Sequence, residues 1–251
     1  MSDFKVGVQL HPQHTTVEEL RAAWRRADEL GFDSIWTWDH FFPLWGDPEG
    51  NHFEGWTLLS ACAVDTAKAQ IGILVSSNSY RNPELLVDMA RTVDHLSEGR
   101  TVLGLGAGWF ERDYEEYGYE FGTAPDRLRS LRAALPRIKA RLGELNPPPV
   151  GRLPILIGGA GEKVTLRLVA EHADMWNSWG PPHVYAHKNA VLDSWCEKTG
   201  RDPASIERTV LMDADEVGDV DAYLNAGVEH FIVKVGHPFD LDPAEKLLRS
   251  A

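Results

Sequence analysis

Short apolar runs alternate with amphipathic helical patterns along the chain, and this alternation constrains the fold more than any other feature. The runs are apolar throughout, as expected of parallel strands that are buried on both faces. They lie at residues 4–10, 34–39, 70–77, 101–106, 154–159, 175–178, 209–213 and 230–235. Eight strand-and-helix units in 251 residues match the length of one (β/α)8 TIM barrel. We therefore predict a single α/β barrel domain over residues 1–251, with a doubly wound open sheet as the rival fold.

The segments between the runs carry the signals of helices. Thr16 is a suitable N-cap and Gly31 a suitable C-terminal stop for the first of them, and Pro83 suits the first turn of another. The predicted helices cover residues 17–30, 56–66, 83–96, 125–142, 162–172, 183–199, 219–226 and 242–250, whereas residues 109–123 are predicted to be an irregular loop. The proline-rich segment 146–154 resembles a domain linker, but the same alternation resumes beyond it. We interpret it as a connection within one domain.

Charge content indicates which classes of partner are expected, and cysteine content indicates the cellular compartment. The 38 acidic and 25 basic residues give a formal net charge of -13, which argues against nucleic acid and against an anionic membrane surface. Cys62 and Cys196 lie far apart without metal-type spacing, which favours a reducing compartment over a disulfide framework. No apolar run approaches the roughly 18 residues of a membrane span. We expect a cytoplasmic protein that binds a small organic molecule.

In a barrel of this kind the functional groups follow the carboxyl ends of the strands. The residues at these positions are mostly small, aromatic or neutral polar: His11 and His14, Asp39 and His40, and residues 76–80, 106–109, 158–161, 177–180, 213–215 and 236–237. These residues are therefore the candidates for the functional site.

Asp39 and His40 form the most specific polar pair in that list. Histidine titrates near neutrality and can donate a hydrogen bond or take part in proton transfer. A histidine at a strand end can also be purely structural, but the neighbouring aspartate favours a functional role. A metal site is not predicted, because His11 and His14 are three residues apart and no acidic cluster follows on later strands.

The turn Gly158-Gly159-Ala160-Gly161 precedes a predicted helix. Free amides at such a point can bind a phosphate, although a tight turn between strand and helix also uses glycine. A Walker loop is excluded because Lys163 is followed by Val164. Barrels often bind phosphate after the seventh and eighth strands, whereas this turn follows the fifth in our count.

Gly104, Gly106 and Gly108 have the wrong spacing for a dinucleotide fingerprint, and no helix is predicted to begin there. They can leave space at the barrel mouth for a flat ring on which Trp109 leans. The alternative is that small residues relieve crowding inside the barrel.

Taken in order, these segments resemble the bacterial luciferase-like family of flavin and deazaflavin barrels, particularly its branch that uses coenzyme F-420. The resemblance covers nearly the whole chain and rests on the order and spacing of Asp39-His40 and of residues 76–83, 104–109, 158–161 and 173–177. It implies a catalytic His40 near the redox ring.

The resemblance also implies the parts of a cofactor pocket. Ser76 and Ser77 would mark a bulge behind the ring, commonly with a non-proline cis peptide. Gly106, Ala107, Gly108 and Trp109, with Asp39, would form its floor and walls. The phosphate end of the cofactor tail would lie against Gly158, Gly159, Ala160, Gly161, Asn177 and Ser178.

Two departures from the family limit what can be transferred. Sugar-phosphate dehydrogenases of this family use a glutamate as acid where this chain has Trp109, so that activity is not expected, and Glu111 lies too far along the chain to replace it. Residues 214–218 are too few for the usual insertion over the substrate, so the substrate side is expected to be open or completed by a partner subunit.

We therefore expect an F-420-dependent oxidoreductase that moves a hydride between the deazaflavin and an organic substrate. The nearest alternative is an FMN-dependent monooxygenase of the same fold, which would need a reductase partner and oxygen. The other alternative is a non-catalytic flavin-binding relative. Exposed tryptophans would favour a homodimer, but the sequence does not rank monomer against dimer.

Overall fold

A computed structural model describes residues 4–251, in which parallel strands close into a barrel. The strands are β1 (Lys5–Leu10), β2 (Ser34–Thr37), β3 (Gln70–Ile73), β4 (Ser76–Ser77), β5 (Thr101–Gly106), β6 (Ile155–Gly158), β7 (Met175–Ser178), β8 (Glu207–Met212) and β9 (His230–Val235). Strand β1 pairs with both β2 and β9, and the pairing of β3 with β5 completes the ring. Since β3 and β4 are two pieces of one barrel strand, the predicted eight-stranded TIM barrel is confirmed.

The third barrel strand is interrupted, which differs from the continuous run predicted over residues 70–77. Strand β3 ends at Ile73, the peptide between Leu74 and Val75 is cis, and Ser76 and Ser77 resume pairing with β5. The break therefore lies before the serine pair. A Cβ added to Gly104 would come within 1.9 Å of the Ile73 carbonyl oxygen, so the interrupted strand requires glycine on its neighbour.

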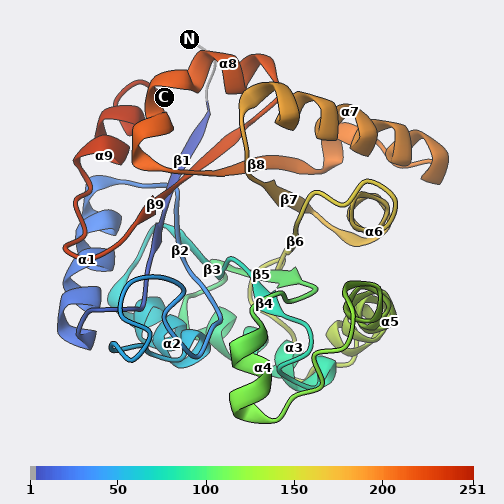
Figure 1. Cartoon of the computed structure of the whole chain (residues 1–251), viewed down its shortest axis with the longest axis horizontal. Coiled ribbons are helices and arrows are strands. Elements are labelled where there is room, and N and C mark those ends of the chain that lie inside the picture. The colour runs from blue at the N-terminus through green and yellow to red at the C-terminus, as the bar shows by residue number, and fades with distance from the viewer. Residues whose placement is uncertain (1–3) are drawn as a thin grey trace.

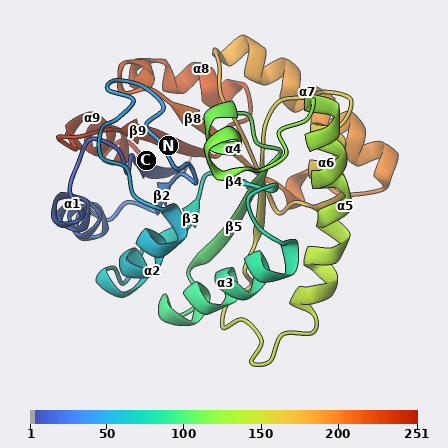
Figure 2. The same cartoon turned by 60° about the horizontal axis from the view of Figure 1, so that its bottom comes forward.

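The helices surround the barrel, as Figures 1 and 2 show from two directions. They are α1 (Val17–Leu30), α2 (Gly55–Asp65), α3 (Pro83–Leu96), α4 (Glu111–Tyr117), α5 (Ala124–Leu142), α6 (Thr165–His172), α7 (Pro182–Thr199), α8 (Val220–Asn225) and α9 (Asp242–Leu248), with short 3-10 helices η1 (Pro203–Ser205) and η2 (Ala214–Asp219). Thr16 caps α1 through a reciprocal capping box with Glu19, and Gly31 ends it in the left-handed conformation, as predicted. None of the helices in residues 4–251 is long and apolar enough to cross a membrane.

Helix α4 was not expected, because residues 109–123 were predicted to be irregular. The helix is short and acidic, but it buries Asp113 and Tyr114 against the barrel mouth. Helix α6 begins at Thr165, three residues later than predicted, so the Gly158 turn is followed by a longer loop. These two corrections concern the segments that shape the site.

The connection over residues 146–154 is tied to α3. A carboxylate oxygen of Asp94 accepts hydrogen bonds from the amides of Val150 and Gly151 at 2.8 and 2.9 Å. Asp94 is fully buried on α3, so the segment is bound to the helix layer.

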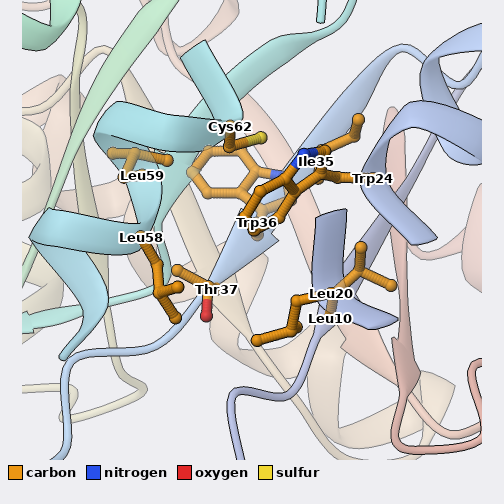
Figure 3. A pocket seen from close by; sticks show the side chains of 9 residues that line it. All are labelled: Leu10, Leu20, Trp24, Ile35, Trp36, Thr37, Leu58, Leu59 and Cys62. Carbon is orange, nitrogen blue, oxygen red and sulfur yellow. The ribbon is translucent and has the colours of Figure 1, made fainter. Parts of the chain in front are cut away.

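Two apolar layers form the core. Six buried side chains fill the barrel interior: Trp36, Leu74, Val102, Leu156, Met175 and Ile232. A larger layer lies between strands and helices and contains the free thiols of Cys62 and Cys196. A cavity of about 10 Å³ lies in this region. Figure 3 shows the side chains that line it, which come from β1, β2, α1 and α2. The cavity is almost wholly apolar and has room for about one water molecule.

Candidate active site

A pocket of about 360 Å³ opens at the carboxyl ends of the strands, where the sequence predicted it. Ten of the predicted residues line it: Asp39, His40, Ser77, Gly106, Ala107, Gly108, Trp109, Gly158, Gly159 and Asn177. The lining also includes Trp179, from the strand-end segment 177–180, and nine residues that were not selected from the sequence: Gln9, Trp38, Leu44, Trp45, Leu74, Val75, Thr165, Leu211 and Lys234.

His40 is held by a buried carboxylate. Its Nδ1 lies 2.6 Å from Oδ2 of Asp113, whose side chain is fully buried. Because a carboxylate can only accept, Nδ1 carries the proton of this bond. The imidazole Nε2, on the other side of the ring, has no protein partner among residues 4–251. The arrangement leaves one nitrogen of this pocket-lining ring without a protein partner.

Asp113 is itself fixed by two further donors. The Phe41 amide donates to Oδ1 at 3.0 Å and the Tyr80 hydroxyl to Oδ2 at 2.7 Å. Burial and the nearby Asp113 carboxylate raise the pKa of Tyr80, so its phenol remains a donor. Asp113 lies on the unexpected helix α4, where only the exposed Glu111 was considered as a candidate acid from the sequence. Residue spacing along the chain gives no signal that would pair it with His40, 73 positions away.

Asp39 supports the site from behind. It is buried, and both of its oxygens accept from the Arg81 guanidinium at 2.5 and 3.0 Å. Arg81 also donates to Glu54, which caps α2. Burial raises the pKa of Asp39, and Arg81 opposes that shift. The carboxylate is therefore engaged in a structural ion pair.

The glycines of β5 and β6 accommodate Val75. A Cβ on Gly106 would lie 2.6 Å from a Val75 methyl carbon, and one on Gly158 would lie 3.0 Å from the other. Crowding by the Val75 side chain thus accounts for glycine at these two positions. That side chain occupies space that the glycines would otherwise leave empty. Both glycines still line the pocket beside it.

Gly108 has a separate constraint. Its φ of +84° is in the left-handed region, and an added Cβ would lie 1.9 Å from the Tyr114 hydroxyl and 2.4 Å from Ser77 Oγ. Those two hydroxyl groups are hydrogen-bonded at 2.8 Å. Gly108 therefore permits a close approach of its backbone to a buried polar pair.

The loop after β6 presents backbone groups with few internal partners. Gly159, with φ +126°, donates its amide to Asn177 O at 2.9 Å. In the described chain, no protein acceptor is found for the amides of Ala160 and Gly161. The loop follows the fifth barrel strand, as counted from the sequence.

Four predicted residues do not line the pocket: Ser76, Ala160, Gly161 and Ser178. The Ser76 hydroxyl accepts from Trp56 Nε1 of α2 at 2.8 Å, so it faces the helix layer. Ser178 is buried. Ala160 and Gly161 lie beyond the pocket edge in the loop that leads to α6.

His11 and His14 have structural surroundings. The His11 ring stacks on Trp38 with a centroid distance of 4.3 Å, and burial lowers its pKa to about 3. His14 Nε2 lies 2.8 Å from the Trp45 carbonyl. Residues 4–251 contain no cluster of three His, Cys, Asp or Glu side chains that could hold a metal ion.

Comparison with known proteins assigns the chain to a family. The family model for luciferase-like monooxygenases matches residues 1–246. The chain belongs to this family. A solved relative of this luciferase-like chain, described as an F-420-dependent secondary alcohol dehydrogenase in complex with an F-420-acetone adduct, has a TM-score of 0.86 at 16% identity and covers 99% of this chain and 98% of that one. The likeness confirms the fold.

Two curated proteins resemble the luciferase-like chain in sequence. The F-420-dependent glucose-6-phosphate dehydrogenase of Amycolatopsis mediterranei (strain U-32) is 33% identical over 138 residues, which cover 54% of this chain and 40% of that protein. The F-420-dependent hydroxymycolic acid dehydrogenase of Mycobacterium tuberculosis (strain ATCC 25618 / H37Rv) is 27% identical over 239 residues, covering 88% and 65%. The chain thus spans less than two thirds of the length of either relative.

Proposed function

We propose that this protein is an oxidoreductase that uses coenzyme F-420 to interconvert an alcohol and a carbonyl compound. The observation that carries the proposal is His40, which lines the pocket with Nδ1 bound to the buried Asp113 and Nε2 free of protein partners in the described chain. Both curated relatives compared above are named as F-420-dependent dehydrogenases.

The pocket has features that fit a flat ring with an anionic tail. Leu74, Val75 and Leu211 give it apolar walls, while Gly106 and Gly158 keep the backbone close to the cavity. The amides of Ala160 and Gly161 would hold the phosphate, because unpaired N–H groups before a helix attract anions. When bound, the deazaflavin would take the hydride that leaves the carbinol carbon, or return it in the reverse direction.

His40 would handle the accompanying proton. As the alcohol loses its hydride, its hydroxyl proton passes to Nε2, and the C–O bond becomes a carbonyl. The Asp113 carboxylate would stabilise the resulting imidazolium and keep Nε2 facing the reacting oxygen. Reduction of a carbonyl uses the same path in reverse.

The remaining predicted site residues would shape or support the pocket. Ser77, bonded to Tyr114, would support the wall beside the ring, Ser76 would anchor that wall to α2, and Trp109 would form the side of the substrate space. Asn177 is held by Thr209 at 2.8 Å, and with Ser178 it would fix the strand end beside the tail. Asp39 would maintain the backbone before His40.

Titration of the purified protein with F-420 and, separately, with FMN tests this function. We expect F-420 to bind with a dissociation constant below about 100 µM, toward the weak end of normal substrate affinities. Failure to bind F-420 in that range would contradict the proposal. Binding of FMN alone, with turnover dependent on oxygen and a reductase, would indicate the monooxygenase, and binding without any turnover would indicate a non-catalytic relative.

A further inference from the structure

The tryptophans divide into buried ones and ones at the barrel mouth. Of the nine in the chain, Trp24, Trp36, Trp38, Trp56 and Trp176 are buried, and Trp195 is partly buried. The other three, Trp45, Trp109 and Trp179, are 50%, 62% and 62% exposed. All three line the same pocket. Large exposed apolar side chains that gather at one cavity mark a binding surface.

These three side chains come from different sides of the rim. Trp45 follows β2, Trp109 follows β5 and Trp179 follows β7. Trp45 makes an edge contact with Trp38 at a centroid distance of 5.1 Å, and Trp109 makes one with His40 at 5.7 Å. Trp45 also packs against His11 and Trp109 against Phe110, but within residues 4–251 none of the three contacts another ring of the three, and each remains half exposed or more.

The charged and titratable side chains that line the pocket are each bound to another side chain, and one of them, His40, transfers the proton in the proposed reaction. Lys234 Nζ donates to Asp213 at 2.7 Å, and Asp39 is bound to Arg81. His40 is bound to Asp113. In the described part of the chain, the lining thus contains no unpaired arginine or lysine to bind a phosphate or carboxylate group on a substrate.

We propose that the substrate is a neutral organic compound with a flat apolar or aromatic body and one hydroxyl or carbonyl group. The body would lie against Trp45, Trp109 and Trp179, because aromatic faces stack on one another and exclude water. The polar group would reach Nε2 of His40, whose ring lies in edge contact with Trp109. A second copy of the chain is disfavoured as occupant, because the exposed rings continue into a pocket that leads to His40.

This inference rests on the proposed function, and direct binding separates the two. Calorimetry would measure the affinity for 2-acetonaphthone, a flat neutral ketone, and for glucose 6-phosphate, with and without F-420. We expect the ketone to bind at least about tenfold more tightly than the sugar phosphate, and Trp109→Ala to weaken ketone binding by about tenfold or more. Trp45→Ala and Trp179→Ala should weaken it as well. Val64→Ala, at a side chain that is 63% exposed on α2, is the matched control and should change nothing.

The results distinguish the proposed cofactor, the proposed substrate class and a dimer formed through the exposed rings. Ketone binding without any F-420 binding would defeat the proposed cofactor and keep the substrate class. F-420 binding together with a preference for glucose 6-phosphate would overturn the substrate class. So would ketone affinities that are the same in the tryptophan variants as in the Val64→Ala control. Sedimentation that shows a dimer dissociated by Trp109→Ala, without ketone binding, would assign the exposed rings to a second copy.

Discussion

The two sides of the pocket mouth differ in how many of their polar groups are hydrogen-bonded or ion-paired to other groups of the protein. On the side of β2 to β5, Asp113 receives three hydrogen bonds, Asp39 is bound to Arg81 and Ser77 is bound to Tyr114. On the side of β6 to β9, the amides of Ala160 and Gly161 lack protein acceptors in the described chain, and the Lys234–Asp213 pair is partly exposed.

The two sides suit two different steps of the proposed function, proton transfer and binding of the cofactor tail. Proton transfer needs a side chain held in one orientation, which requires buried and fully paired neighbours. Tail binding needs backbone donors that remain unpaired until the ligand arrives. We therefore expect substitutions on the paired side to affect turnover or folding, and substitutions in the open loop to affect cofactor affinity.

Asp113→Asn should have the largest effect on turnover among substitutions of the residues that hold His40. The neutral amide no longer stabilises an imidazolium, so kcat should fall by about 100-fold, while the dissociation constant for F-420 stays within about threefold. Tyr80→Phe removes one donor but keeps the carboxylate, so a smaller loss of a few fold is expected. Steady-state kinetics with cofactor titration would measure both. Unchanged kcat with weakened cofactor binding would place Asp113 on the tail side instead.

Gly108→Ala should strongly destabilise the paired side. Its Cβ would overlap the Ser77 and Tyr114 hydroxyl groups, and the left-handed backbone adds strain, so the free energy of unfolding should fall by about 3 kcal/mol. Gly118→Ala is the matched control, because its φ is +69° but an added Cβ meets nothing within 4 Å. A loss of only about 1 kcal/mol is expected there. Equal losses by denaturant unfolding would show that strain alone, without the overlap, sets the cost.

Stability should also depend on pH through His11, which follows β1 and stacks on Trp38. Its folded pKa of about 3 lies below the usual histidine value of 6.5, because burial disfavours the charged ring. Between those values the unfolded chain binds the extra proton, so stability is lost as the pH falls from 6.5 toward 3, by about 2 kcal/mol between pH 7 and pH 5. His52, with a pKa lowered to about 4, acts in the same direction.

His11→Phe isolates this contribution, since phenylalanine can still stack on Trp38 and does not titrate. Denaturant unfolding at pH 7 and pH 5 should show a smaller pH dependence in this variant than in the wild type. The same dependence in both proteins would remove His11 as its source.

Gly161→Ala should have the smallest effect, and it should appear in cofactor affinity. An added Cβ would lie 2.8 Å from Thr165 Oγ1 and would shift the loop that presents free amides. We expect F-420 to bind about tenfold more weakly, equivalent to about 1.4 kcal/mol, with little change in unfolding free energy. Gly218→Ala, where an added Cβ meets nothing within 4 Å, is the control. An affinity equal to that of the control would exclude the loop from tail binding.

The barrel was predictable because its determinants are local. Apolar runs, Thr16, Gly31 and Pro83 each indicate their structure within a few residues, and the strands and helices follow them. The resemblance implied a bulge at Ser76 and Ser77, and the break lies just before them, at Leu74 and Val75. Its exact position was not predictable from local sequence, since it depends on glycines in β5 and β6 that make room for it.

The site was predictable only in part, for the same physical reason. His40 and the Gly158 turn carry their chemistry in their own sequence and position. The pairing of His40 with Asp113 joins a strand end and a helix that are distant in the chain, and Trp45 and Lys234 reach the pocket only through barrel closure. No local pattern marks such contacts.

Transfer of deuterium from an alcohol to the cofactor tests the central claim most directly. Wild-type protein and His40→Ala would be mixed with oxidised F-420 and with a panel of neutral aromatic alcohols, including 1-phenylethanol, deuterated at the carbinol carbon, and the reduced cofactor would be analysed by mass spectrometry. The account predicts deuterium on the cofactor with the wild type, and a rate lower by about 100-fold or more with His40→Ala, which still binds F-420. His95→Ala, on the far end of α3, should behave as the wild type. No transfer from any alcohol of the panel, or equal rates for the wild type and His40→Ala, would contradict it.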